Sequence, residues 1–166
     1  MNVHFLVISP PSFTITLERR TSATEPLFRP ALDRLHEPVK NALIKDGWTI
    51  THDPFMLRYD DLDVFADLGA ERALAAEREG SKIAVEIKSF LQPSLVRELE
   101  QAIGQYVVYR SLLDALEPER KLYLAISHLI YDGFFQRPAI QLIVDGSELP
   151  LIVVNVENEE VVQWIS

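Results

Sequence analysis

The chain has 166 residues, of which 48% are hydrophobic and 25% are charged, the mixture of an ordinary globular domain. This composition excludes a chain that is disordered as a whole. With 16 Lys and Arg against 25 Asp and Glu, the net charge is -9, which argues against holding nucleic acid or an anionic membrane surface by bulk electrostatics alone. The absence of cysteine excludes disulfides, iron–sulfur clusters and thiol nucleophiles, so a metal ion would need oxygen or histidine ligands.

The sequence divides into an N-terminal extension, residues 1–29, and a domain that covers residues 30–166. The extension is rich in proline, serine and threonine, so we expect little stable structure in it; an edge strand at residues 14–17 is the alternative. No apolar run approaches the ~20 residues that cross a bilayer, and the basic segment of a signal peptide is missing. We therefore expect a cytoplasmic protein with no membrane partner.

The first half of the domain begins with a helix and continues into strands. Apolar residues recur at helical spacing over residues 32–43, and Gly47 ends the pattern. Residues 48–51 are predicted to be extended. Residues 73–77 and 82–90 then form a predicted β-hairpin, whose turn contains Gly80. The second hairpin strand alternates strictly, so Ile83, Val85 and Ile87 share one face while Lys82, Ala84, Glu86 and Lys88 share the other.

The second half begins with a long helix, which Pro93 and Ser94 open and which continues to about residue 116. Further along the chain we expect a buried strand at 122–126, a short helix at 129–135, a helix at 138–144 (with a strand as the alternative), a buried strand at 151–156 and a last extended piece at 161–165. Together these elements predict an α/β fold, a mixed β-sheet flanked by helices.

The strand pair Glu86 and Lys88 is the first candidate for chemistry. Two residues apart on a strand, a carboxylate and an ammonium project from one face. If Asp67 enters from a neighbouring strand, two carboxylates and the Ile87 main-chain carbonyl suit Mg²⁺ or Mn²⁺, and Lys88 would orient water or stabilise charge on a phosphodiester. The alternative is a solvated same-face pair without function.

Two helices carry the other candidates. Gln101, Gln105 and Tyr109 are spaced by four residues and share one face of the long helix. They either face the Glu86 and Lys88 site, where they would hydrogen-bond a metal-bound phosphate or order the lysine, or form a solvated edge. Glu37, on the first helix, matters only if that helix packs across the mouth of the site; its neighbour His36 is expected at the helix end or surface.

This order of residues resembles the PD-(D/E)xK restriction-endonuclease-like superfamily. There an acid on a helix, an aspartate, a Glu-x-Lys strand and a helix that often reads Gln-x-x-x-Tyr follow one another. The resemblance implies catalytic roles for Glu37, Asp67, Glu86, Lys88 and Gln105. The departure is at the aspartate: Ala66 precedes Asp67 where the superfamily has proline, and the gap to Glu86 is long, so Asp63 and Glu77 are substitutes.

A closer resemblance, over roughly residue 30 to the end, is to the XisH family, the fdxN element excision controlling factors. The matching segments are HEPVKNALIKDGWTIT (36–51), ADLGAE (66–71), AAER (75–78), IAVEIKSF (83–90) and VQWI (162–165). The resemblance implies an endonuclease-like fold and a role in programmed excision of a DNA element, beside a site-specific recombinase and a small XisI-type partner. Because family members begin near residue 29, residues 1–29 are expected to derive from an upstream start codon or a lineage-specific extension.

Three functions are compatible with these residues. The first is a metal-dependent nuclease or nuclease-fold DNA-processing factor. The second is a non-catalytic regulator that binds a protein partner; five acids and no base at 141–160 favour this one. The third is a restriction- or toxin-like nuclease restrained by such a partner. DNA contacts are expected on residues 72–121, which hold eight bases, and whether the chain forms a homo-oligomer stays open.

Overall fold

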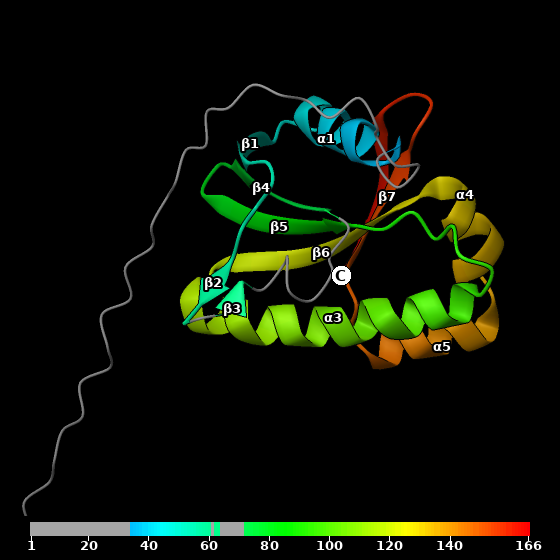
Figure 1. Cartoon of the computed structure of the whole chain (residues 1–166). Helices are drawn as coiled ribbons and strands as arrows, with labels where there is room; N and C mark the ends of the chain where they lie inside the picture. Colours follow the sequence, from blue (N-terminus) through cyan, green and yellow to red (C-terminus); the bar gives the residue numbers. More distant parts are fainter. Residues whose placement is uncertain (1–33, 61, 64–71) are drawn as a thin grey trace, which may run out of the picture.

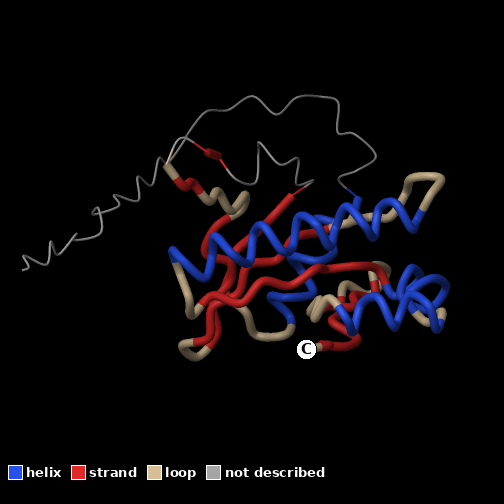
Figure 2. Tube along the Cα trace, turned by 90° about the horizontal axis from the view of Figure 1, so that it is seen from below, coloured by secondary structure: helices blue, strands red, loops and turns tan. Residues whose placement is uncertain are grey.

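A computed structural model describes residues 34–60, 62–63 and 72–166. The expected extension at 1–29 and the candidate Asp67 lie outside these residues. The described chain forms a six-stranded mixed sheet in the order β1-β4-β5-β6-β7-β8, with helices on both faces (Figures 1 and 2). The predicted α/β class, a mixed sheet flanked by helices, is therefore confirmed.

The first helix, α1 (His36–Lys45), ends where Gly47 adopts a φ of 89°. A left-handed residue at this position is the usual way to end a helix, and glycine adopts it without a steric penalty. The chain then enters β1 (Thr49–His52), the strand predicted at residues 48–51. A small separate pair follows, β2 (Arg58–Tyr59) with β3 (Leu62–Asp63).

The predicted hairpin is formed by β4 (Arg72–Arg78) and β5 (Ser81–Ile87), antiparallel to each other. The two turn residues, Glu79 and Gly80, have φ values of 47° and 82°. Two consecutive positive values match the right-handed twist of the flanking strands, which is why such turns close two-residue hairpins. The hairpin places Ala73 directly opposite Glu86.

The long helix is α3 (Leu95–Leu116), and the hydroxyl of Ser94 accepts a hydrogen bond from the Arg97 N–H at its start. It crosses over to β6 (Arg120–Ser127), which pairs in parallel with β5. The short helix predicted at 129–135 becomes α4 (His128–Ile130) followed by a π-helical turn, η2 (Tyr131–Phe135). α5 (Pro138–Gly146) is helical, as the proline at its first turn suggested.

The last two strands complete the sheet. β7 (Leu151–Asn155) lies parallel to β6, and β8 (Glu160–Ile165) returns antiparallel to β7. Among the described residues, none of the helices combines the length and the apolar character needed to cross a membrane.

Two hydrophobic cores lie between the sheet and the helices that cover its two faces. One lies between the sheet and α1 and includes Val39, Leu43, Val85 and Ile152. The other lies between the opposite sheet face and α3 and includes Ala84, Tyr109 and Leu124. Figure 1 shows α1 on one side of the sheet and α3 with α5 on the other. The side chains of β5 thus alternate between the two faces as the sequence predicted, with Ala84 and Glu86 on the α3 side.

Candidate functional site

Glu86 and Lys88 lie beneath α3, at the end of β5 in the middle of the sheet. Only 2% of Glu86 and 3% of Lys88 is exposed. Lys88 follows the last residue of β5, but its N–H still donates to the Ala125 carbonyl at 3.1 Å, so the main chain is held in the sheet at this point. The pair is therefore buried, unlike the solvated pair that was the alternative expectation.

Helix α3 supplies the residues that face this pair. Lys88 Nζ donates to Gln105 Oε1 at 3.1 Å, a contact between two buried side chains. One turn further, Tyr109 is fully buried. Burial, and secondly the negative charge of Glu86, raise the pKa of the Tyr109 phenol, so the phenol keeps its proton close to the Glu86 carboxylate. We call Glu86, Lys88, Gln105 and Tyr109 the Glu–Lys cluster.

The other member of the predicted polar stripe is not part of the cluster. Gln101, one turn before Gln105, is exposed. Of the three residues expected to form one polar stripe, α3 therefore buries Gln105 and Tyr109 and leaves Gln101 exposed.

The candidate acids are placed differently. Asp67 and the side chain of Asp63 lie outside the described residues. Glu77 is on the same strand and face as Ala73, but four residues away, about 13 Å along the strand. Its carboxylate lies 3.4 Å from the guanidinium of Arg120. Glu77 is therefore part of an ion pair at the opposite end of the hairpin and does not join the Glu–Lys cluster.

Glu37 is also not brought to the cluster. Its helix, α1, packs on the opposite face of the sheet, its side chain is 51% exposed, and Oε1 lies 3.4 Å from Nδ1 of His36. His36 is the first residue of α1, as expected for a helix-end residue, but it is buried and not at the surface.

A divalent ion would find few ligands among the described residues alone. No group of three or more His, Asp or Glu side chains in this part of the chain could hold a metal ion. At the cluster, Glu86 supplies one carboxylate and Ile87 a main-chain carbonyl. Oxygen ligands of this kind suit Mg²⁺, but a further carboxylate would have to come from outside the described residues.

Sequence reasoning missed a second ionic group, on the α1 side of the sheet. His36 Nε2 lies 2.8 Å from Asp53 Oδ1, and Lys40 Nζ donates to Asp53 Oδ2 at 2.7 Å. The one available signal was the four-residue spacing of His36 and Lys40, which puts both on one helix face. Nothing in the sequence placed Asp53 opposite them.

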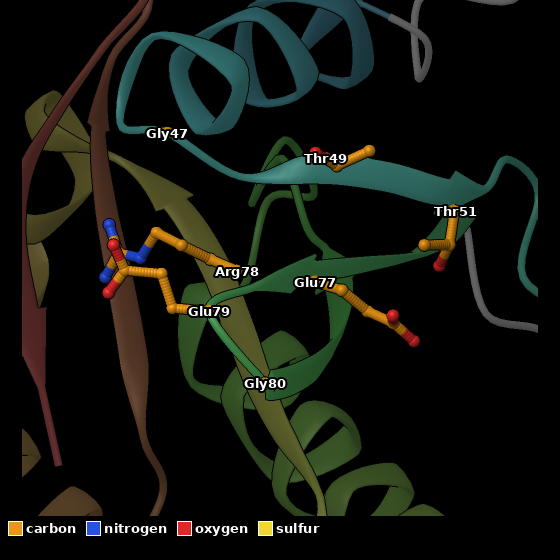
Figure 3. A pocket seen from close by; sticks show the side chains of 7 residues that line it. All are labelled: Gly47, Thr49, Thr51, Glu77, Arg78, Glu79 and Gly80. Carbon is orange, nitrogen blue, oxygen red and sulfur yellow. The ribbon is translucent and has the colours of Figure 1, made fainter.

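An open cavity of about 530 Å³ lies at the far end of the hairpin, where Gly47, Thr49, Glu77 and Arg78 contribute to its lining. Figure 3 shows that the labelled side chains diverge: Arg78 and Glu79 extend to one side, Glu77 and Thr51 to the other. Because no reactive groups converge there, the Glu–Lys cluster is the stronger candidate site.

The fold and the cluster define an α/β protein in which a buried Glu-x-Lys strand packs against a Gln-x-x-x-Tyr helix. A comparison with protein-family models identifies the particular family: the one described as XisH protein matches residues 29–162. The chain belongs to the XisH family.

Two solved structures are similar over the same domain. An XisH family protein from Nostoc punctiforme PCC 73102 is 40% identical, with a TM-score of 0.73 over 81% of this chain and 100% of that one. A fdxN element excision controlling factor protein from Anabaena variabilis is 41% identical, with a TM-score of 0.73 over 81% of this chain and 99% of that one. No curated protein matches the chain.

Proposed function

We propose that this chain controls the programmed excision of a DNA element, and that its domain is a PD-(D/E)xK restriction-endonuclease-like fold with the Glu–Lys cluster as a magnesium-dependent nuclease site. The similar Anabaena protein is described as an excision controlling factor, which supports the first part. The buried hydrogen bond from Lys88 Nζ to Gln105 Oε1, on the sheet face that holds Glu86, carries the second.

The roles of the residues follow from their chemistry. An ammonium and a carboxylate are costly to bury, and such groups gather where function needs them. Glu86, with the Ile87 carbonyl and Asp67, would hold Mg²⁺ or Mn²⁺. That ion would supply charge neutralisation and an activated water when bound. Lys88 would donate to the phosphate oxygens, and Gln105 holds its Nζ in one position.

The test is cleavage of supercoiled plasmid DNA in Mg²⁺ or Mn²⁺ by the wild type and Lys88→Met. Methionine keeps most of the unbranched stem but removes the charge, so we expect the rate to fall by about 10²–10³-fold, as when a transition-state donor is lost. Lys45→Met is the matched control, because Lys45 is an exposed lysine of α1, on the opposite face of the sheet, and lies 3.8 Å from Glu159. It should cleave like the wild type.

The burial of Glu86 and Lys88 favours a second candidate, a non-catalytic regulator that acts through a small XisI-type protein partner beside a site-specific recombinase. A phosphodiester cannot touch groups that are 2–3% exposed unless the cluster opens. This candidate predicts no cleavage by the wild type in either metal, together with co-purification of a small partner. Equal cleavage by the wild type and Lys88→Met would instead contradict the proposed role of Lys88.

A further inference from the structure

Apart from the ring nitrogens of His36, which lie beside Glu37 and Asp53, two buried polar atoms outside the Glu–Lys cluster have no hydrogen-bond partner in the part of the chain that the structure describes. They are Ser89 Oγ and His128 Nδ1. Ser89 comes two residues after the end of β5, and His128 directly after β6. Because these strands are parallel neighbours, with Ile87 beside Ala125, both residues lie at the carboxyl ends of the two strands, where Lys88 also lies.

Aromatic contacts hold the two segments together beyond the strands. The ring of Phe90 lies 6.3 Å from that of Phe134 and 5.4 Å from that of Phe135. The guanidinium of Arg137 lies over Phe134, 5.6 Å from the ring centroid. Figure 1 shows β6 leading into α4 at these carboxyl ends. Through its contact with Phe134, Arg137 thus belongs to the same end of the sheet as Ser89 and His128.

Arg137 is exposed, and no acidic side chain pairs with it among residues 34–60, 62–63 and 72–166. Other bases are paired, for example the half-buried Lys82 with Glu119 and the exposed Lys45 with Glu159. In a chain with a net charge of -9, an arginine without an acidic partner is available for an anion from outside.

The three groups have the chemistry that binds a phosphate. A guanidinium is the preferred side chain for phosphate oxygens, and an unsatisfied buried hydroxyl or imidazole nitrogen is costly unless a partner arrives. The carboxyl ends of parallel strands are also the usual place for ligands in open α/β sheets. Ser89 Oγ and His128 Nδ1 are buried although their residues are only half-buried, so a water would connect these two atoms to the ligand.

We infer that Ser89, His128 and Arg137 form a contact for one backbone phosphate of DNA, next to the Glu–Lys cluster; the inference rests on the proposed function. Arg137 binds the phosphate directly. His128 and Ser89 hold the bridging water and so position the strand relative to Glu86 and Lys88.

The first test is binding of a short fluorescein-labelled DNA duplex, by anisotropy, across a series of salt concentrations and in the presence of EDTA. We expect Arg137→Gln to weaken binding about 5–10-fold and to lower the slope of log K against log salt by about 0.9, the value for one lost phosphate contact. Lys45→Gln is the matched control. It removes the same charge from an exposed position of α1, which packs on the opposite face of the sheet, and should leave both quantities unchanged.

The second test separates the water-mediated contact from packing. His128→Leu should weaken binding about 3–10-fold, whereas His128→Asn, whose amide can replace Nδ1, should retain most of the affinity. Duplex binding that is equal in the wild type, Arg137→Gln and His128→Leu would overturn this inference alone. A wild type that binds no duplex even at low salt would overturn the proposed DNA-processing function as well.

Discussion

Asp53 shows how one side chain can fix a helix to the sheet. Its carboxylate accepts a hydrogen bond from Lys40 Nζ and lies next to Nε2 of the buried His36. Both residues come from the first two turns of α1. Burial opposes the charged form, but the hydrogen bond from Lys40 and the charge of His36 outweigh it, so the pKa of Asp53 is lowered. The ionised carboxylate therefore contributes stability in the folded state.

The lowered pKa of Asp53 sets the pH at which this contribution is lost. It is fully present above the unfolded pKa of about 3.9 and disappears as the pH falls through the lower folded value. We expect Asp53→Asn to lower the free energy of unfolding at neutral pH by about 1–3 kcal/mol and to make stability less dependent on pH below about 4. Urea unfolding at several pH values measures both. Parallel curves for the two proteins over the acid range would contradict this explanation.

At the level of elements, the β4–β5 hairpin depends on its turn. Gly80 has a φ of 82°, and a Cβ added there would meet no atom within 4 Å. A substitution is therefore costly only through the backbone. Gly80→Ala should lower the free energy of unfolding by about 1–2 kcal/mol, the cost of a left-handed non-glycine residue.

Gly104, in the middle of α3, provides the matched control. It has the same open surroundings but no positive φ. Gly104→Ala should raise the free energy of unfolding by about 0.5–1 kcal/mol, because alanine is the better helix former. Thermal unfolding of the two variants checks the contrast; shifts of the same sign would show that the turn conformation is not what Gly80 provides.

The elements were largely predictable because the signals are local. The period-two pattern of β5 assigned Glu86 to the face opposite Val85, and the four-residue spacing of Gln105 and Tyr109 put both on one side of α3. Which helix covers which face is not local, and so the position of Glu37 on the far side of the sheet could not be read from the sequence. The burial of His36 could not be predicted from the sequence either, because it depends on the chain bringing Asp53 next to α1. The role of Asp67 stays a prediction.

At the scale of the whole molecule, Asp46 joins segments from both ends of the domain. Its Oδ2 accepts hydrogen bonds from the indole N–H of Trp48 and of Trp164, each at 3.3 Å, and from Arg78 at 3.2 Å. Trp164 lies 118 residues further along the chain, on the edge strand β8. One carboxylate at the end of α1 thus holds the last strand to the first hairpin.

This arrangement predicts that removing the carboxylate loosens β8 before the rest of the sheet. Asp46→Ala leaves the two indole N–H groups without their acceptor, whereas Arg78 keeps its hydrogen bond to the Asp46 main-chain carbonyl. We therefore expect a loss of about 1–3 kcal/mol in the free energy of unfolding, a red-shifted tryptophan emission and faster hydrogen exchange in β8. The control is Asp114→Ala, which makes the same change in charge at an exposed position of α3 and should alter none of these. The central strands β5 and β6, buried on both faces, should keep their protection in both variants. Exchange that accelerates equally in β5, β6 and β8 would mean that Asp46 stabilises the domain as a whole and does not hold the edge strand in particular.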